Sequence, residues 1–278
     1  MPVKIVTDSC SDLPANIAKV LGITIVPVYI CIGNKTYRDG VDISAEDVYK
    51  RLEKGSRHPT TVQPKPADFA NVYSELSKEA DTIVSIHLPA KLSGTYNAAI
   101  QGKVMAKTKC DIEVVDSLSV SMGLGLIVMA AARVAQAGGN LKQVLFETKR
   151  VINKVQIFGI MDSLKHLLDG GRISKTKVTP DTLLRVKPLL SLKGGEVFQA
   201  SLVRTYAKGL ERQFDFVNKA IDVNEVAIVH STTPDEANTL KKRISSIVNE
   251  KRIHVARLGA GLGVHCGPKT MITAIRTV

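Results

Sequence analysis

The sequence predicts an α/β protein in which an N-terminal domain with a parallel sheet packs on a C-terminal α+β domain with a mixed or antiparallel sheet. Over the first half, short apolar runs alternate with helical patterns, which favours parallel strands covered by helices on both faces. The second half contains a β-hairpin signal over Leu189–Ala200, with Gly194-Gly195 at its turn. At 278 residues the chain exceeds one typical domain. We therefore expect two tightly packed domains, residues 1–155 and 156–278.

The elements of the first half follow from short apolar runs and helix-start signals. The predicted strands are Val3–Thr7, Ile23–Ile32, Thr82–Ile86 and Ile112–Val115, and the predicted helices are Pro14–Leu21, Ser44–Lys54, Pro66–Ala80, Ser93–Lys107, Val120–Ala137 and Leu141–Lys154. The segment His58–Pro66 carries three prolines, which predicts a shaped loop without regular structure. That loop displays Thr60, Thr61 and Gln63.

The elements of the second half are less regular and include antiparallel pairing. The predicted strands are Gln156–Met161, the two arms of Leu189–Ala200, Glu225–His230 and His254–Leu258, and the predicted helices are Leu164–Leu168, Tyr206–Ala220 and Pro234–Asn249. Glycines precede His265 and Gly267-Pro268 follows it, so we expect this histidine to lie outside a helix or strand.

Composition narrows the class of protein. Apolar residues make up 44% of the chain, yet no run of about 18 apolar residues occurs, so no transmembrane helix is expected. The N-terminus reads as a strand rather than a signal peptide. The four cysteines form no Cys-x-x-Cys and have no histidine at metal-ligand spacing. We expect reduced thiols, no metal site and a cytoplasmic location.

The charge of the chain is +12, which favours acidic partners such as nucleic acid, an anionic lipid surface or an acidic protein. Its basic residues are scattered, and the densest groups, Lys241-Lys242-Arg243 and Lys251-Arg252, flank one predicted helix. A solvated helix face explains them better than a nucleic-acid footprint. Aromatic residues total 4% and Trp is absent, which disfavours base stacking. A basic regulatory or nucleic-acid-binding module is therefore the weakest of the functions considered.

Polar residues follow three of the predicted parallel strands. Asp8-Ser9, Ser93-Gly94-Thr95 and Asp116-Ser117 each come where a strand gives way to a loop. In parallel sheets, ligands bind beyond the carboxyl ends of the strands. Backbone N–H groups and hydroxyls at the start of the helix after Ser93 suit a carboxylate or phosphate. A rival interpretation is a phosphotransfer enzyme that uses Asp8 or Asp116.

Several catalytic and nucleotide-binding motifs are missing. Neither the phosphate-loop pattern nor Gly-x-Ser-x-Gly occurs. Gly259-Ala260-Gly261-Leu262-Gly263 follows a predicted strand, but Val264 stands where a dinucleotide fingerprint needs its third glycine. The sequence therefore gives no direct sign of nucleotide binding or of a catalytic serine.

Taken together, the motifs resemble those of the DegV family, the fatty-acid-binding proteins that serve bacterial fatty acid kinases. The similar segments are Thr7–Leu13, Thr60–Pro64, Leu92–Tyr96, Asp116-Ser117, Gly170–Ser174, Lys187–Leu190, Val203–Thr205 and His265–Pro268. Their order and spacing span essentially the whole chain. Val62 and Lys269 depart from the family pattern and leave the details of the head-group contacts open.

This resemblance implies a binding protein without catalytic residues and without a cofactor, which encloses one long-chain fatty acid between its domains. The ligand is palmitate-like, about C14–C20, so burial of its methylene groups supplies most of the affinity. The resemblance places the carboxylate at Thr61, Ser93 and His265, with further head-group contacts at Thr60, Gly94 and Thr95. Residues 1–155 then carry the head-group loops and residues 156–278 cover the lipid tail.

The resemblance also implies a partner enzyme. A separate fatty acid kinase phosphorylates the bound carboxylate, and the acyl phosphate feeds phospholipid synthesis. Arg172 and Arg204 match family arginines associated with docking of the kinase. The positive charge of the chain suits transient contact with an anionic membrane, where fatty acids partition.

Overall fold

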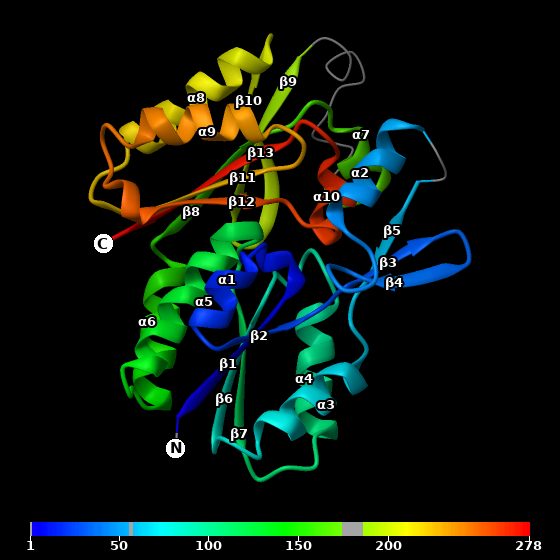
Figure 1. Cartoon of the computed structure of the whole chain (residues 1–278), viewed down its shortest axis with the longest axis vertical. Coiled ribbons are helices and arrows are strands. Elements are labelled where there is room, and N and C mark those ends of the chain that lie inside the picture. Colours follow the sequence, from blue (N-terminus) through cyan, green and yellow to red (C-terminus); the bar gives the residue numbers. More distant parts are fainter. Residues whose placement is uncertain (1, 56–57, 174–185) are drawn as a thin grey trace.

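The computed structural model describes residues 2–55, 58–173 and 186–278 (Figure 1). Within these ranges the strands form a four-stranded, a six-stranded and a three-stranded sheet. The four-stranded and six-stranded sheets occupy opposite halves of the molecule (Figure 1). The predicted α/β architecture, with a parallel sheet and a mixed sheet, is confirmed. Of the segments that carried the sequence resemblance, Ser174 lies outside the described residues.

The four-stranded sheet is parallel, with strand order β2-β1-β6-β7. Its strands are β1 (Val3–Asp8), β2 (Ile23–Val26), β6 (Thr82–His87) and β7 (Asp111–Asp116). The helices before residue 155 are α1 (Ala15–Val20), α2 (Ala45–Glu53), α3 (Pro66–Leu76), α4 (Thr95–Met105), α5 (Ser121–Gln136) and α6 (Leu141–Ile152), of which α2 lies beside α10 (Figure 1). Because the strands are parallel, the loops that follow β1, β6 and β7 meet at one edge.

The six-stranded sheet is mixed, with strand order β10-β9-β8-β13-β11-β12. Its strands are β8 (Val155–Ile160), β9 (Lys187–Lys193), β10 (Glu196–Val203), β11 (Val223–His230), β12 (Ile253–Arg257) and β13 (Met271–Thr277). The helices here are α7 (Lys165–Asp169), α8 (Tyr206–Asn218), α9 (Pro234–Ile244) and α10 (Ala260–Cys266). The predicted hairpin is confirmed, and Gly194 and Gly195 at its turn have φ of 56° and 78°. Sequence reasoning missed β13, the strand between β8 and β11.

The three-stranded sheet corrects one prediction. It consists of β4 (Lys35–Arg38), β3 (Tyr29–Ile32) and β5 (Thr60–Val62). The segment His58–Pro66 was predicted to lack regular structure, yet its centre is a strand that pairs antiparallel with β3. The prolines flank β5, so none removes a donor from the ladder. Similarly, the predicted strand Ile23–Ile32 is divided at Pro27-Val28 into β2 and β3.

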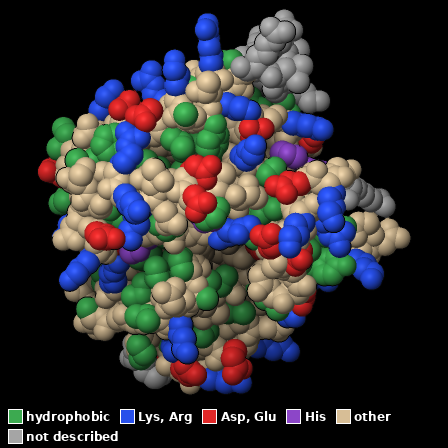
Figure 2. Space-filling view, turned by 45° about the horizontal axis from the view of Figure 1, so that its top comes forward, with side chains coloured by type: hydrophobic (Ala, Val, Ile, Leu, Met, Phe, Trp, Pro, Cys, Tyr) green, Lys and Arg blue, Asp and Glu red, His purple; other side chains and the backbone are tan. Residues whose placement is uncertain are grey.

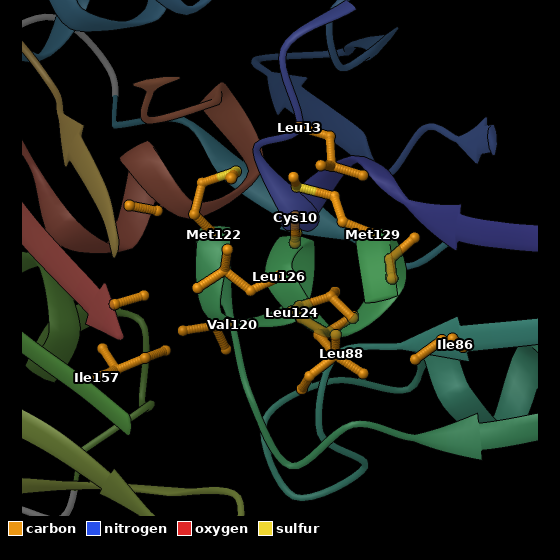
Figure 3. Packing of buried hydrophobic residues seen from close by; sticks show 14 of the residues in the cluster. Cys10, Leu13, Ile86, Leu88, Val120, Met122, Leu124, Leu126, Met129 and Ile157 are labelled. Carbon is orange, nitrogen blue, oxygen red and sulfur yellow. The ribbon is translucent and has the colours of Figure 1, made fainter. Parts of the chain in front are cut away.

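Helix α5 lies between the two large sheets. It contacts β1 and β6 on one side and β8, β11 and β13 on the other. Figure 3 shows its first turns between Cys10, which follows β1, and Ile157 of β8. One buried apolar cluster therefore includes residues from both halves of the chain. The domain boundary at residue 155, directly at the start of β8, stays a prediction.

The charged side chains are dispersed over the surface. Figure 2 shows Lys and Arg mixed with Asp and Glu rather than gathered into one basic patch on that face. In the basic group on α9, Lys241 pairs with Glu250 and Arg243 with Glu211. These pairs fit the solvated helix face that the sequence suggested. No helix in the described ranges has the length and apolar character needed to cross a bilayer.

Candidate functional site

A cavity opens between the two large sheets, next to α10 and the three-stranded sheet. The empty space within it and at its mouth is about 940 Å³, a figure that includes open solvent. Its wall is mostly apolar. The apolar lining residues are Cys10, Val28, Val62, Leu88, Leu92, Val120, Ile157, Met161, Leu167, Leu190, Leu192, Val197, Leu262, Cys266 and Ile272, together with Gly159 and Gly261. Such a lining suits an alkyl chain.

Six polar side chains also line this cavity: Thr61, Gln63, Ser93, Arg172, His265 and, on β9, Ser191. The three residues that the sequence assigned to the carboxylate are among them. They come from β5, from the loop between β6 and α4, and from α10. The cavity therefore combines a long apolar wall with a small set of donors, as expected for an amphipathic ligand.

Thr61 and His265 contact each other directly. The distance between Thr61 Oγ1 and His265 Nε2 is 2.8 Å. Thr61 lies opposite Ile30 in the register of β5 on β3. His265 was expected outside regular structure, but it lies in the last turn of α10, so that prediction was wrong. The glycines that suggested a loop are tolerated in the helix because neighbouring side chains need the space.

Ser93 follows β6, just before α4. Its Oγ accepts a hydrogen bond from the Thr95 N–H at 3.2 Å and lies 2.9 Å from Thr95 Oγ1. Gly94 is the residue before the first turn of α4, and its missing side chain leaves room for Gln63, whose amide would lie 3.1 Å from a Cβ there. The strand-to-helix transition predicted for this stretch is thus present, and residues 88–94 form the loop between β6 and α4.

Thr60, Gly94 and Thr95, which were predicted as further head-group contacts, do not line the cavity. Thr60 alternates with Thr61 along β5 and its side chain is exposed. Thr95 is fully buried beneath Ser93, and Gly94 offers only backbone. Gln63, which the sequence displayed but did not assign to the site, lines the cavity beside Ser93. The Gln63 side chain fits beside Ser93 because Gly94 has no Cβ.

The polar part of the cavity is electropositive. Arg172 lines it, and its guanidinium donates to the Leu92 carbonyl oxygen at 3.4 Å and to the Gly170 carbonyl oxygen. Burial, together with the nearby charge of Arg172 and the imidazoles of His58 and His166, lowers the pKa of His265 to about 4. His265 is therefore neutral at pH 7, and Arg172 supplies the positive charge.

The remaining predicted residues lie elsewhere. Arg204 is exposed just after β10 and does not line the cavity. Asp8 is fully buried and accepts hydrogen bonds from the Cys10 and Leu88 N–H groups, and its Oδ2 lies 2.9 Å from His87 Nδ1. Asp116 accepts hydrogen bonds from the N–H groups of Ala90 and Leu118. Both carboxylates thus hold loops in place, and no cluster of potential metal ligands occurs in the described part of the chain.

The two cysteines that lie near the site are buried in the cavity wall. Burial raises the pKa of the Cys266 thiol to about 12, and burial beside Asp8 and Asp39 raises that of Cys10 as well. These thiols are protonated at pH 7 and act as small apolar side chains. They contribute to the apolar wall and are not nucleophiles.

Comparison with known proteins identifies the relatives of this chain. Residues 2–276 match the family described as "Uncharacterised protein, DegV family". A DegV domain-containing protein of Caldanaerobacter subterraneus subsp. tengcongensis is 36% identical over 269 residues, covering 96% of this chain and 95% of the relative. A DegV family protein from Thermus thermophilus, whose structure is described as fatty acid binding, has a TM-score of 0.91 and 31% identity, with both chains fully covered. DegV of Bacillus subtilis, described as a fatty acid binding protein, has a TM-score of 0.88 and 25% identity over the full length of both chains.

Proposed function

This chain belongs to the DegV family, and we propose that it binds one long-chain fatty acid in the cavity and presents the carboxylate to a partner kinase. The observation that carries the proposal is the division of the cavity wall. Thr61, Ser93, His265 and Arg172 line one cavity, Thr61 contacts His265, and the rest of the lining is largely apolar. The carboxylate is held at these polar groups, and the alkyl tail lies along the apolar wall.

The tail supplies most of the binding free energy. Each buried methylene contributes roughly 0.8 kcal/mol, so a palmitate-like chain (about C14–C20) has a gross term on the order of 12 kcal/mol before the costs of association. One hydrogen bond to the charged carboxylate adds about 1.5–3 kcal/mol. Thr61 and Ser93 therefore act mainly by fixing where the carboxylate lies.

The electrostatic surroundings favour an anion over a neutral head group. Among the described residues, Arg172 is the only Lys or Arg that lines the cavity, and His265 is neutral before the ligand binds. A carboxylate beside the imidazole favours its protonated form, so binding raises the pKa of His265. A fatty acid is thereby distinguished from a fatty alcohol or ester of the same length.

A fixed carboxylate suits phosphoryl transfer by a second protein, because that reaction depends on alignment of the attacking oxygen. The chain itself then acts without catalytic residues, and Arg172 and the exposed Arg204 contribute to docking of the kinase. The acyl phosphate produced would enter phospholipid synthesis. The rival phosphotransfer mechanism would use Asp8 or Asp116. Both side chains accept hydrogen bonds from backbone N–H groups, and neither lines the cavity.

The free cysteines and the positive charge of the chain suit a protein that acts in the cytoplasm next to membranes. All four cysteines are free thiols, which suits a reducing cytoplasm. The charge of +12 favours brief contact with anionic membrane surfaces, from which a fatty acid can be taken up. Specific recognition of nucleic acid is not part of this proposal.

A reconstituted reaction tests the function. The chain is incubated with palmitate, MgATP and a bacterial fatty acid kinase catalytic subunit, and acyl phosphate is trapped as its hydroxamate. Product is expected only when chain, kinase and palmitate are all present. Turnover by the chain and MgATP alone, or product formation that is independent of the chain, would contradict the proposal.

A further inference from the structure

Two buried aspartic acid side chains hold the start of α10, the helix that carries His265. The Gly259 N–H donates to Asp12 Oδ1 at 2.8 Å, the Ala260 N–H to Asp39 Oδ1 at 3.2 Å and the Gly261 N–H to Asp39 Oδ2 at 3.1 Å. Asp12 and Asp39 are only 8% and 6% exposed. The glycines permit this approach, because a Cβ on Gly259 would lie 2.9 Å from Asp12 Oδ1. This is the structural role of the glycine-rich run that resembled a dinucleotide fingerprint.

The three-stranded sheet holds α10 at both ends. Asp39 directly follows β4, Thr61 lies in β5, and both strands pair with β3. Asp39 binds the first turn of α10, and Thr61 contacts His265 in its last turn. A short helix transmits a displacement along its axis because its backbone hydrogen bonds keep the rise per residue fixed. The two contacts therefore fix the position of the imidazole relative to the Thr61 hydroxyl.

We propose that Asp39 is a positioning residue for the carboxylate site and acts through α10 on His265. The inference rests on the proposed function, since it concerns the same head-group site. Donors must stay within about 0.5 Å of their productive positions to recognise a ligand group. Without Asp39, the Ala260 and Gly261 N–H groups would be buried without acceptors, so the first turn of α10 would move to find new partners.

Asp39 is itself held rigidly. The Ser9 hydroxyl donates to its Oδ2 at 2.9 Å, and the Ser9 Oγ accepts from the Val28 N–H at 3.1 Å. The Asp39 N–H donates to the Val28 carbonyl oxygen at 2.9 Å. Asp12, in contrast, is attached through Ser121 to α5, where the Ser121 hydroxyl lies 2.6 Å from its Oδ2. Asp39 is thus the carboxylate that connects α10 to the same sheet as Thr61.

The test compares palmitate with hexadecanol, which has the same tail and no carboxylate. Dissociation constants are measured for the wild type, Asp39→Asn, His265→Ala and the double variant. Asparagine keeps one acceptor oxygen but turns an NH₂ group toward the second N–H. We expect Asp39→Asn to lower the preference for acid over alcohol about tenfold, the effect of one lost charged hydrogen bond. In the His265→Ala background the same substitution is expected to leave the preference unchanged.

Asp42→Asn is the matched control, since Asp42 lies on the same turn, is exposed and pairs with Arg38. It is expected to leave the acid-to-alcohol preference at the wild-type value. Ser9→Ala is a milder second variant, which removes one donor to Asp39 and is expected to lower the preference by less. The His265 imidazole gives an independent readout by NMR, because its pKa is expected to rise from about 4 when α10 shifts.

Two outcomes would overturn the inference. One is an equal loss of affinity for acid and alcohol in Asp39→Asn with an unchanged His265 titration, which indicates a structural role only. The other is an equal drop in preference with and without His265, which shows that Asp39 acts independently of it. If the wild type binds palmitate no better than hexadecanol, the head-group site of the proposed function fails first, and this inference with it.

Discussion

Thr61 Oγ1 and His265 Nε2 lie 2.8 Å apart, although the two residues are 204 positions apart in the sequence. The tautomer of His265 decides what Thr61 can do. If Nε2 carries the proton and donates to Thr61, the threonine hydrogen is free to point to a ligand. The Nδ1 atom is buried beside Gly170, and no partner for it occurs among the described residues. An Nδ1 atom without a partner favours the tautomer whose proton lies on Nε2, because that proton is then hydrogen-bonded to Thr61. The arrangement therefore favours Thr61 as a donor to a carboxylate.

Substitution of the hydroxyl residues should separate binding from phosphorylation. Ser93→Ala and Thr61→Ala are expected to retain much of the fatty acid affinity, because the tail supplies most of it. Both should lower the yield of acyl phosphate with the kinase, since the carboxylate is no longer held in one position. Equilibrium binding and hydroxamate yield are measured side by side. Thr36→Ala, an exposed hydroxyl on β4, is the control. Unchanged yield in both variants would rule out the assigned head-group contacts.

The stability of the protein should decrease as the pH falls from about 6.5 to 4. The pKa of His265 is about 4 in the folded protein and ordinarily 6.5, so in this window the unfolded chain binds a proton that the folded chain excludes. His265→Gln removes this titration, and its urea midpoint should therefore fall less between pH 7 and pH 5 than that of the wild type. An identical fall in both proteins would show that His265 is not held neutral by burial.

Asp12 should have the opposite pH dependence. Burial raises its pKa from 3.8 to about 8, so between these values the folded protein keeps a proton that the unfolded chain has lost. Its contribution to stability therefore decreases as the pH rises toward 8. Asp12→Asn resembles the protonated form and should gain stability relative to the wild type between pH 6 and pH 9. Urea midpoints at both pH values check this, and a constant difference would show that Asp12 does not titrate in this range.

Filling the apolar part of the cavity should shorten the preferred ligand. Val197 of β10 lines the cavity, and Val197→Phe occupies space that the tail would use. Affinity should fall most for the longest fatty acids, by roughly 0.8 kcal/mol for each methylene displaced. Leu202→Phe, a partly exposed position on the same strand, is the control. The dissociation constants of wild type and Val197→Phe are compared for fatty acids of increasing chain length. An equal loss of affinity at every length would show that the tail does not lie beside Val197.

Docking of the kinase should depend on charge. Arg172→Ala and Arg204→Ala are each expected to weaken association, and the loss should be largest at low salt, where charge interactions are least screened. Surface plasmon resonance at two salt concentrations measures this. Lys19→Ala, on the distant α1, serves as the control. Wild-type affinity in both arginine variants at low salt would exclude them from the interface.

The elements that sequence reasoning located are those with local signals. The run Val3–Thr7 contains three apolar residues and forms a largely buried parallel strand, and Gly194-Gly195 gave the hairpin its turn. The helix predicted from Ser44 is present as α2, and Ser44 and Asp47 form a capping box at its start. In each case the residues that determine the structure lie within a few positions of one another.

The features that sequence reasoning missed depend on contacts with residues that are far away in the sequence. Thr60–Val62 is a strand only because β3 lies beside it, and neighbouring prolines gave the opposite signal. His265 is helical because α10 is held by Asp39 and by Tyr49, whose hydroxyl donates to the Leu258 carbonyl oxygen. Gln63 joins the cavity wall through its packing on Gly94. None of these contacts leaves a periodic pattern in the sequence.

Native mass spectrometry of the purified protein tests the central claim most directly. The wild type, isolated without added lipid, should retain a single ligand with the mass of a C14–C20 fatty acid, and Val197→Phe should shift that mass to a shorter chain. A protein that carries no lipid and takes up none when palmitate is supplied would contradict the assignment of the cavity.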